Sequence, residues 1–284
     1  MSLEPGKMYE INGVNYHVYD QGHSDKVALL VHGWPDQSDV WAAQVEALQK
    51  AGYRTIVPDQ LGWGKTDTPA DPQRYELSKP VADNIALLDA MGIDKVDVLI
   101  GHDWGAFMTW CMCYEIPERI GKHVALSVGH PQAFYDSMSF EQNLGNFYMY
   151  QVNMPGWKAL ALENNGEWLR KYYIPTHPNL DELVERLKAG DIDAMVNWEL
   201  GNPHNHSFIA WLRGEIKFPP CTVPTLGVWG TGDLPYLLEQ QILNSEKYME
   251  ASWSYKRHEC NSHWQQVDEP ERVNKFILDW LGES

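Results

Sequence analysis

The chain has 284 residues, 44% of them hydrophobic and 21% charged, with a formal net charge of −17 at pH 7. This composition is that of an ordinary globular protein, large enough for one main domain with an insertion, and it argues against extensive disorder. The acidic excess argues against a nucleic-acid partner and an anionic membrane surface, because no basic patch is available to neutralise phosphates. A small neutral molecule is the favoured substrate.

The cysteines and the N-terminal segment favour a reduced, cytoplasmic protein. The four cysteines have no metal-ligand spacing, and two of them lie two residues apart on an expected helix: Cys111, Cys113, Cys221 and Cys260. The N-terminal MSLEPGKMYE is polar and lacks the apolar stretch of a signal peptide. No apolar run is long enough to span a membrane. We therefore expect a soluble cytoplasmic protein without a bound metal, and nothing in the sequence specifies an oligomeric state.

In the first 130 residues, short apolar runs alternate with longer amphipathic segments. Strands are expected at Lys26–Val31, Arg54–Pro58, Lys95–Ile100 and His123–Val128. Helices are expected at Asp36–Ala51 and Ser78–Met91, and another begins within Phe107–Tyr114. Strands separated by helices in this way predict an α/β fold with a mostly parallel central sheet and helices on both faces.

The alternation stops between about Pro131 and Pro220, where Tyr, Trp, Met, Asn and Gly are frequent and helical patches such as Leu180–Ala189 occur. It resumes with strands at Thr225–Trp229 and Trp253–Lys256 and ends with a helix near Glu271–Leu281. A structureless loop of such length is uncommon within a compact domain. We therefore predict a core formed by residues 1–130 and 221–284, with residues 131–220 inserted as a helical cap.

The most informative segment is the pentapeptide GHDWG at residues 101–105. It follows an expected strand and precedes an expected helix, which is the context of the G-x-S-x-G nucleophile elbow. Asp103 occupies the central position in place of serine. An alternative is a simple glycine-bounded turn in which Asp103 caps the helix. Its position after a core strand favours a nucleophilic role.

A carboxylate nucleophile implies a particular reaction. It displaces a leaving group from an electrophilic sp³ carbon and forms an alkyl ester of the enzyme. Water must then attack the ester carbonyl, which requires a base to activate the water and hydrogen-bond donors for the tetrahedral oxyanion. Candidates for both functions follow other expected strands.

The loop VHGWPD at residues 31–36 follows the first strong strand and is the candidate oxyanion loop. In elbow hydrolases the oxyanion donors are the backbone N–H of the residue after the nucleophile and one from such a loop. The matching donors here are Trp104 and Trp34. An ordinary Gly-Pro turn at the end of a strand is the alternative.

The candidate base is His263, in the segment NSHW just before the final helix. His258 is the competing histidine, but it lies at the end of an alternating strand pattern, where a structural role is favoured over a catalytic one. Asp233, in the turn GTGD after a strand, is the candidate orienting acid. The resulting order of nucleophile, acid and histidine is that of the hydrolases with a nucleophile elbow.

The chain resembles the epoxide hydrolases of the α/β-hydrolase superfamily. The likeness rests on HGWPD at 32–36, PDQLGWGKTDTP at 58–69, GHDWGA at 101–106, HP at 130–131, GTGD at 230–233 and SHWQQVDEP at 262–270. The resemblance implies an α/β-hydrolase fold with a helical cap. It also implies a cofactor-independent hydrolase that opens a small or medium apolar epoxide to a diol through an aspartyl alkyl ester.

In that family two cap tyrosines donate their hydroxyl groups to the epoxide oxygen. The first lies seven residues before a Pro-Gly pair, which corresponds to Tyr148 here, with Tyr150 as a nearby alternative in the substrate pocket. The second follows a Trp and precedes an Arg, a position that is occupied by Leu212 in this chain. We expect Leu212 to line the substrate pocket, where the second hydroxyl is then missing: either one donor suffices, or another residue such as Tyr172 or Tyr173 reaches in, or the substrate is not an epoxide.

Two other functions remain open. Haloalkane dehalogenases use an Asp nucleophile followed by a Trp that binds the halide, but they read Pro-Thr where this chain has Pro35-Asp36. Fluoroacetate dehalogenases carry Arg at the position of Trp104. A non-catalytic small-molecule receptor of the same fold is a third possibility, although the complete set of Asp103, Asp233 and His263 argues against it.

Overall fold

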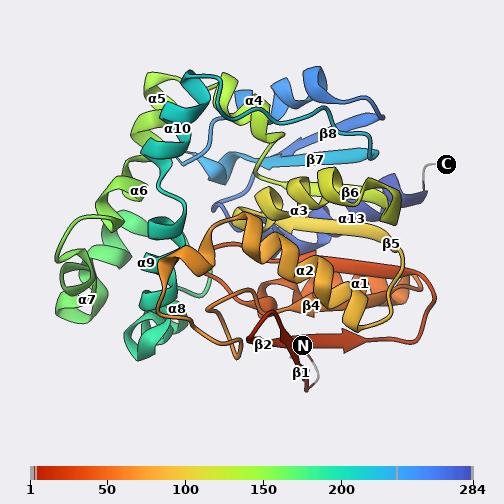
Figure 1. Ribbon diagram of the computed structural model, residues 1–284, viewed down its shortest axis with the longest axis horizontal. Helices are drawn as coiled ribbons and strands as arrows, with labels where there is room; N and C mark the ends of the chain where they lie inside the picture. Colours follow the sequence, from red (N-terminus) through yellow and green to blue (C-terminus); the bar gives the residue numbers. More distant parts are fainter. Residues whose placement is uncertain (1–2, 4, 235, 283–284) are drawn as a thin grey trace.

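The computed structural model describes residue 3, residues 5–234 and residues 236–282. An eight-stranded sheet with the order β1-β2-β4-β3-β5-β6-β7-β8 forms its centre (Figure 1). The strands are β1 (Lys7–Ile11), β2 (Val14–Gln21), β3 (Val27–Val31), β4 (Arg54–Pro58), β5 (Val96–His102), β6 (Ile120–Leu126), β7 (Thr225–Gly230) and β8 (Trp253–His258). From β4 through β8 every neighbouring pair is parallel, which confirms the expected mostly parallel sheet.

The sequence analysis missed β1 and β2, which add an antiparallel edge to the sheet. In β1, whose sequence is KMYEI, only Ile11 is fully buried. An exposed edge strand with charged residues has neither the apolar run of a buried strand nor a clean alternation, so its sequence signal is weak.

Helices cover both faces of the sheet. The pair α2 (Ser78–Ala90) and α3 (Trp104–Glu115) packs on one face, and the pair α1 (Ala42–Lys50) and α13 (Pro270–Gly282) packs on the other (Figure 1). Strand β3 shows how one strand supplies both faces, because Val27, Leu29 and Val31 join one core cluster and Ala28 and Leu30 join another. This division follows from the two-residue period of a β-strand.

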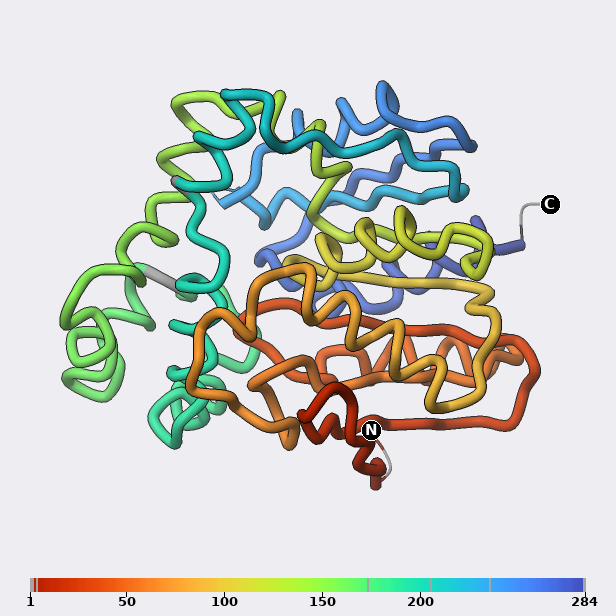
Figure 2. The backbone as a smooth tube through the Cα atoms, viewed as in Figure 1, coloured from red at the N-terminus to blue at the C-terminus, as the bar shows by residue number. Residues whose placement is uncertain are grey.

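The segment between β6 and β7 leaves the sheet, folds as a series of short helices and returns (Figure 2). Its α-helices are α4 (Pro131–Asp136), α5 (Phe140–Gly145), α6 (Phe147–Val152), α7 (Trp157–Trp168), α8 (Leu180–Arg186), α9 (Ile192–Gly201) and α10 (His204–Leu212). Helix α4 packs against α11 (Glu239–Leu243) of the sheet domain, whereas α5 to α10 lie beyond one end of the sheet (Figure 1). Across the described residues, no helix has both the length and the apolar character that a membrane crossing requires.

Candidate active site

Asp103 lies at the sharp turn between β5 and α3, with a φ angle of 55°. Such an angle is uncommon for a residue with a side chain and is frequent at functional sites. Two glycines permit the turn. A Cβ atom at Gly33 would overlap the Asp103 side chain, and one at Gly105 would overlap the carbonyl oxygen of Val31. The Asp103 side chain makes no capping hydrogen bond to α3, so the helix-cap alternative does not describe this residue.

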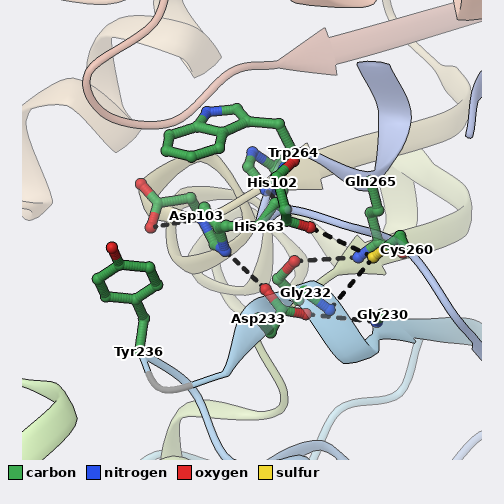
Figure 3. Close-up of polar contacts among 12 residues, drawn as sticks. His102, Asp103, Gly230, Gly232, Asp233, Tyr236, Cys260, His263, Trp264 and Gln265 are labelled. Carbon is green, nitrogen blue, oxygen red and sulfur yellow. Dashed lines mark hydrogen bonds and ion pairs between the residues drawn. The ribbon is translucent and has the colours of Figure 1, made fainter. Parts of the chain in front are cut away.

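Three residues from separate strand ends meet beside this turn (Figure 3). The Nδ1 atom of His263 lies 2.6 Å from an oxygen of Asp233, and its Nε2 atom lies 3.5 Å from an oxygen of Asp103. The other oxygen of Asp233 accepts the backbone N–H of Gly230 at 3.3 Å. His263 therefore lies between the expected nucleophile and the expected acid, in the arrangement that the strand order predicts.

The charge environment of His263 favours its protonated form. Burial lowers the pKa of His263, but hydrogen bonds and charge from Asp103 and Asp233 outweigh burial and raise it to about 10. The neighbouring His102 is held neutral, since burial and the charge of His263 lower its pKa to about 3. His102 donates from Nε2 to the backbone carbonyl of His263 at 3.1 Å and thereby supports the loop that carries His263.

The oxyanion loop contacts Asp103 directly. The backbone N–H of Trp34 donates to an oxygen of Asp103 at 2.8 Å. Trp104 is the first residue of α3, and N–H groups in the first turn of a helix have no intrahelical acceptor. The indole N–H of Trp34 donates to the carbonyl of Met195 in α9 at 3.2 Å, which ties the loop to the cap. Both expected oxyanion donors thus lie next to the expected nucleophile.

Asp36 joins three parts of the site. It is buried, accepts from Nε2 of His177 in the cap at 3.0 Å, and accepts the indole N–H of Trp264 beside the base. Burial raises the pKa of Asp36, but the hydrogen bond and charge of His177 outweigh it and hold the pKa at about 2. The motif HGWPD therefore contributes a carboxylate that links the oxyanion loop, the cap and the His263 loop.

A cavity of about 390 Å³ lies between the sheet domain and the cap. The residues around the candidate nucleophile that line it are Asp103, Trp34, Trp104, Tyr148, Tyr236 and His263. Aromatic side chains line another part, where Phe107 meets Phe134 edge to face at 5.3 Å and Phe218 stacks on Tyr135 at 6.0 Å. The cavity therefore combines a polar reaction region with an apolar aromatic region.

The structure differs from the sequence-based expectation at two pocket positions. Tyr150 and Leu212 are not among the described residues that line the cavity. Tyr150 packs edge to face on His204 at 5.8 Å, because it lies half a helical turn from Tyr148 on α6. Leu212 is 63% exposed at the end of α10. Both assignments to the substrate pocket are therefore corrected.

The other expected cap tyrosines differ in their positions. Tyr148 lines the cavity, and burial together with the negative charge of Asp103 raises its pKa well above the ordinary value. Tyr172 is 62% exposed and is not among the described residues that line the cavity, and the side chain of Tyr173 lies outside the described residues. Of the two candidates at 148 and 150, Tyr148 is among the described residues that line the cavity with Asp103, and Tyr150 is not.

Two residues near Asp103, one half-buried and one buried, were not expected from the sequence. Tyr236 follows Asp233 by three residues and lines the cavity from the sheet domain. Tyrosine donors were expected only from the cap, so no sequence motif pointed to it. Glu199 lies on α9 and is fully buried, and neither of its oxygens has a well-formed hydrogen bond within the described chain. Burial and the charge of Asp103 raise the pKa of Glu199 to about 8, while the Trp104 side chain that contacts it limits the rise. In the sequence Glu199 is one of two acids on α9, and no pattern distinguishes it.

Known proteins share this architecture. The family described as the alpha/beta hydrolase fold matches residues 27–270. An epoxide hydrolase of Caballeronia sordidicola is 37% identical, with 82% of each chain covered. Epoxide hydrolase 4 of Homo sapiens is 29% identical over 96% of this chain and 77% of its own length. The crystal structure of the Bacillus megaterium epoxide hydrolase with an inhibitor has the same fold, with a TM-score of 0.84 at 24% identity over 98% of this chain and 100% of that one. The chain belongs to the α/β-hydrolase fold family, among the epoxide hydrolases.

Proposed function

We propose that the protein hydrolyses small or medium apolar epoxides to diols, with Asp103 as the nucleophile of a two-step reaction. The observation that carries this proposal is a carboxylate at the nucleophile elbow within reach of His263, which in turn is bound to Asp233. A carboxylate at this position suits displacement at carbon, and the histidine is placed to act on the ester that results.

In the first step an oxygen of Asp103 attacks a carbon of the epoxide ring. The new ester C–O bond forms as the ring C–O bond breaks, and the electron pair of the broken bond goes to the epoxide oxygen. Tyr148 is placed to stabilise that oxygen, because it lines the cavity and stays protonated. A positioned phenol of this kind lowers the barrier by donating a hydrogen bond or a proton to the developing alkoxide.

In the second step water hydrolyses the ester. When Asp103 becomes a neutral ester, His263 loses one of the two negative charges that raise its pKa, so it becomes able to accept a proton from water. The backbone N–H groups of Trp34 and Trp104 are suited to stabilise the oxyanion on Asp103. Collapse of that intermediate releases the diol and returns Asp103 as a carboxylate.

The lining of the cavity supports an apolar substrate. Phe107, Phe134 and Phe218 form an apolar surface that lies in the same cavity as Asp103. Burial of an aryl or alkyl substituent there would contribute about 25 cal/mol for each Å² of apolar surface removed from water. The protein's strong negative charge is also compatible with a neutral substrate.

Haloalkane dehalogenation fits the site less well. A halide departs as an anion and needs N–H donors, yet the Trp104 indole contacts the Glu199 carboxyl group and the Trp34 indole N–H donates to Met195. Relatives that match 82–96% of this chain include several that are named epoxide hydrolases. Both observations favour an epoxide.

The decisive experiment separates the two chemical steps. His263→Gln should react once with an aryl epoxide and then stop, because Gln cannot activate water for ester hydrolysis. Intact-protein mass spectrometry should detect an adduct equal to the mass of the epoxide, and peptide mapping should locate it at Asp103. Asp103→Asn in the same background is the matched control and should form no adduct.

The unmodified protein should be assayed with epoxides and brominated alkanes in parallel, scoring diol and bromide release. Bromide release without diol formation would replace the proposal with dehalogenation. A folded His263→Gln protein that never forms an adduct would contradict Asp103 as the nucleophile. Turnover by the unmodified protein would also exclude a non-catalytic receptor.

A further inference from the structure

The cavity contains a second phenol that comes from the sheet domain rather than the cap. Tyr236 contacts the ring of Tyr148 edge to face at 6.0 Å and the ring of His263 at 6.5 Å. Figure 3 shows its ring beside His263 with the hydroxyl group directed toward the Asp103 carboxylate. The Tyr236 hydroxyl thus faces the region where Asp103 would attack a substrate.

The backbone around Tyr236 is held by a buried cap residue. The side-chain amide of Gln142 in α5 donates to the carbonyl of Tyr236 at 2.7 Å and accepts the N–H of Leu238 at 2.9 Å. Gln142 is 1% exposed, and its amide nitrogen also donates to Asn146 at 3.0 Å. One fully buried amide therefore fixes both sides of the short segment that carries the phenol.

The chemistry of Tyr236 suits a hydrogen-bond donor. Burial raises the pKa of Tyr236 above its ordinary value, so the phenol keeps its proton at neutral pH. Two donors to one developing alkoxide distribute its negative charge better than one donor does. The exposed Leu212 and Tyr172 cannot supply that second donor from their positions outside the cavity.

We propose that Tyr236 is the second catalytic hydroxyl of this enzyme and acts together with Tyr148 on the epoxide oxygen, while Gln142 positions it. This inference rests on the proposed epoxide hydrolysis. As the ring C–O bond breaks, the oxygen takes the electron pair and a proton from one of the two phenols. The His263 imidazolium returns a proton to that phenolate, which leaves His263 neutral and ready to activate water.

The test measures adduct formation in the His263→Gln background, where only the first step occurs. Tyr236→Phe and Tyr148→Phe should each slow that step by about 10–100-fold, and the double variant by about 10²–10⁴-fold, the range for a lost general acid. Tyr172→Phe removes an exposed cap phenol outside the cavity and is the matched control, with an unchanged rate expected. Each substitution deletes only one oxygen atom, so thermal melting should report intact folding.

Two further measurements distinguish a donor from a structural residue. Epoxides with electron-withdrawing substituents stabilise their own alkoxide, so Tyr236→Phe should slow their reaction less than that of unactivated epoxides. Gln142→Leu should slow adduct formation when Tyr236 is present and have little effect in the Tyr236→Phe background, because residues that act through one another are not additive. This second variant also tests the proposal if Tyr236→Phe folds poorly.

The outcomes separate the inference from the proposed function. If Tyr148→Phe slows adduct formation while Tyr236→Phe retains the unmodified rate, Tyr236 is not a donor and epoxide hydrolysis still holds. If Tyr236→Phe slows activated and unactivated epoxides equally, its role is structural and the inference is wrong. If no epoxide is turned over and no adduct forms on Asp103, the proposed function itself fails.

Discussion

The sheet domain and the helical cap build opposite sides of the same cavity by different means. In the sheet domain, Asp103, Asp233 and His263 follow β5, β7 and β8, and parallel strands bring such ends to one edge. In the cap, short helices are interrupted by two π-helical turns, Leu169–Tyr173 and Leu187–Asp191. The residues at the strand ends are therefore positioned by a regular sheet, whereas the residues of the cap are positioned by irregular helix packing.

The two sides of the cavity differ in how well their buried carboxyl groups are hydrogen-bonded. Asp233 orients His263 through a short hydrogen bond and is itself held by the backbone of its own turn. Glu199, on the cap side, is equally buried but lacks a comparable set of partners within the described residues. Ionisation of a buried carboxyl group with few hydrogen bonds costs stability, and burial accordingly raises the pKa of Glu199.

The largest expected effect comes from removing a charge on the sheet side. Asp233→Asn keeps the shape of the side chain but withdraws the negative charge that helps to raise the pKa of His263. Ester hydrolysis should slow by roughly 10⁴-fold, as in triads whose orienting acid is replaced by its amide. Adduct formation should suffer less, because His263 acts as a base only in the second step.

Rapid-quench kinetics would measure the two steps of Asp233→Asn separately. The expected signature is a burst of adduct followed by very slow diol release. Equal slowing of both steps would indicate that Asp233 mainly maintains the structure around Asp103.

A smaller effect, on stability rather than rate, is expected on the cap side. The folded protein holds the Glu199 proton up to about pH 8, whereas an unfolded chain releases it near pH 4.3. Between those values the folded state binds more protons, so this group lowers the free energy of unfolding as pH rises. Each unit of raised pKa corresponds to about 1.4 kcal/mol, so Glu199→Gln should become progressively more stable than the unmodified protein across this window.

Urea unfolding at pH 5, 7 and 8.5 would test the Glu199 prediction. Glu118→Gln removes the same charge from an exposed position and is the matched control, with no comparable trend expected. A constant difference between Glu199→Gln and the unmodified protein at all three pH values would contradict a retained proton on Glu199.

The smallest effect is expected at Leu212, which occupies the position where the family has its second cap tyrosine. Because this side chain is 63% exposed and outside the cavity, Leu212→Tyr should leave the rate of adduct formation unchanged. It should change the free energy of unfolding by no more than about 0.5 kcal/mol, the usual range at surface sites. Adduct kinetics and thermal melting would check this. A faster reaction with epoxides would mean that the end of α10 closes over the cavity during turnover.

The parallel sheet and the turn at Asp103 could be predicted from the amino-acid sequence, and so could the position of Asp233 and His263 beside that turn. Asp103 and Asp233 follow buried apolar strands and lie in glycine-containing turns, which are local signals. The approach of His263 to both residues follows from the topology of parallel strands. Of the two strands that were not predicted, β1 is the exposed edge strand, and polar residues interrupt the apolar pattern of its neighbour β2.

Which cap and loop residues line the cavity depends on tertiary packing and could not be predicted from the sequence. Two tyrosines lie two positions apart on α6 and therefore face different sides of the helix. Tyr148 lines the cavity, whereas Tyr150 packs on His204. Tyr236 reaches the site because Gln142, 94 residues earlier in the chain, holds its backbone. Contacts between such distant segments depend on how the cap docks on the sheet domain, and neither periodicity nor turn chemistry encodes that docking.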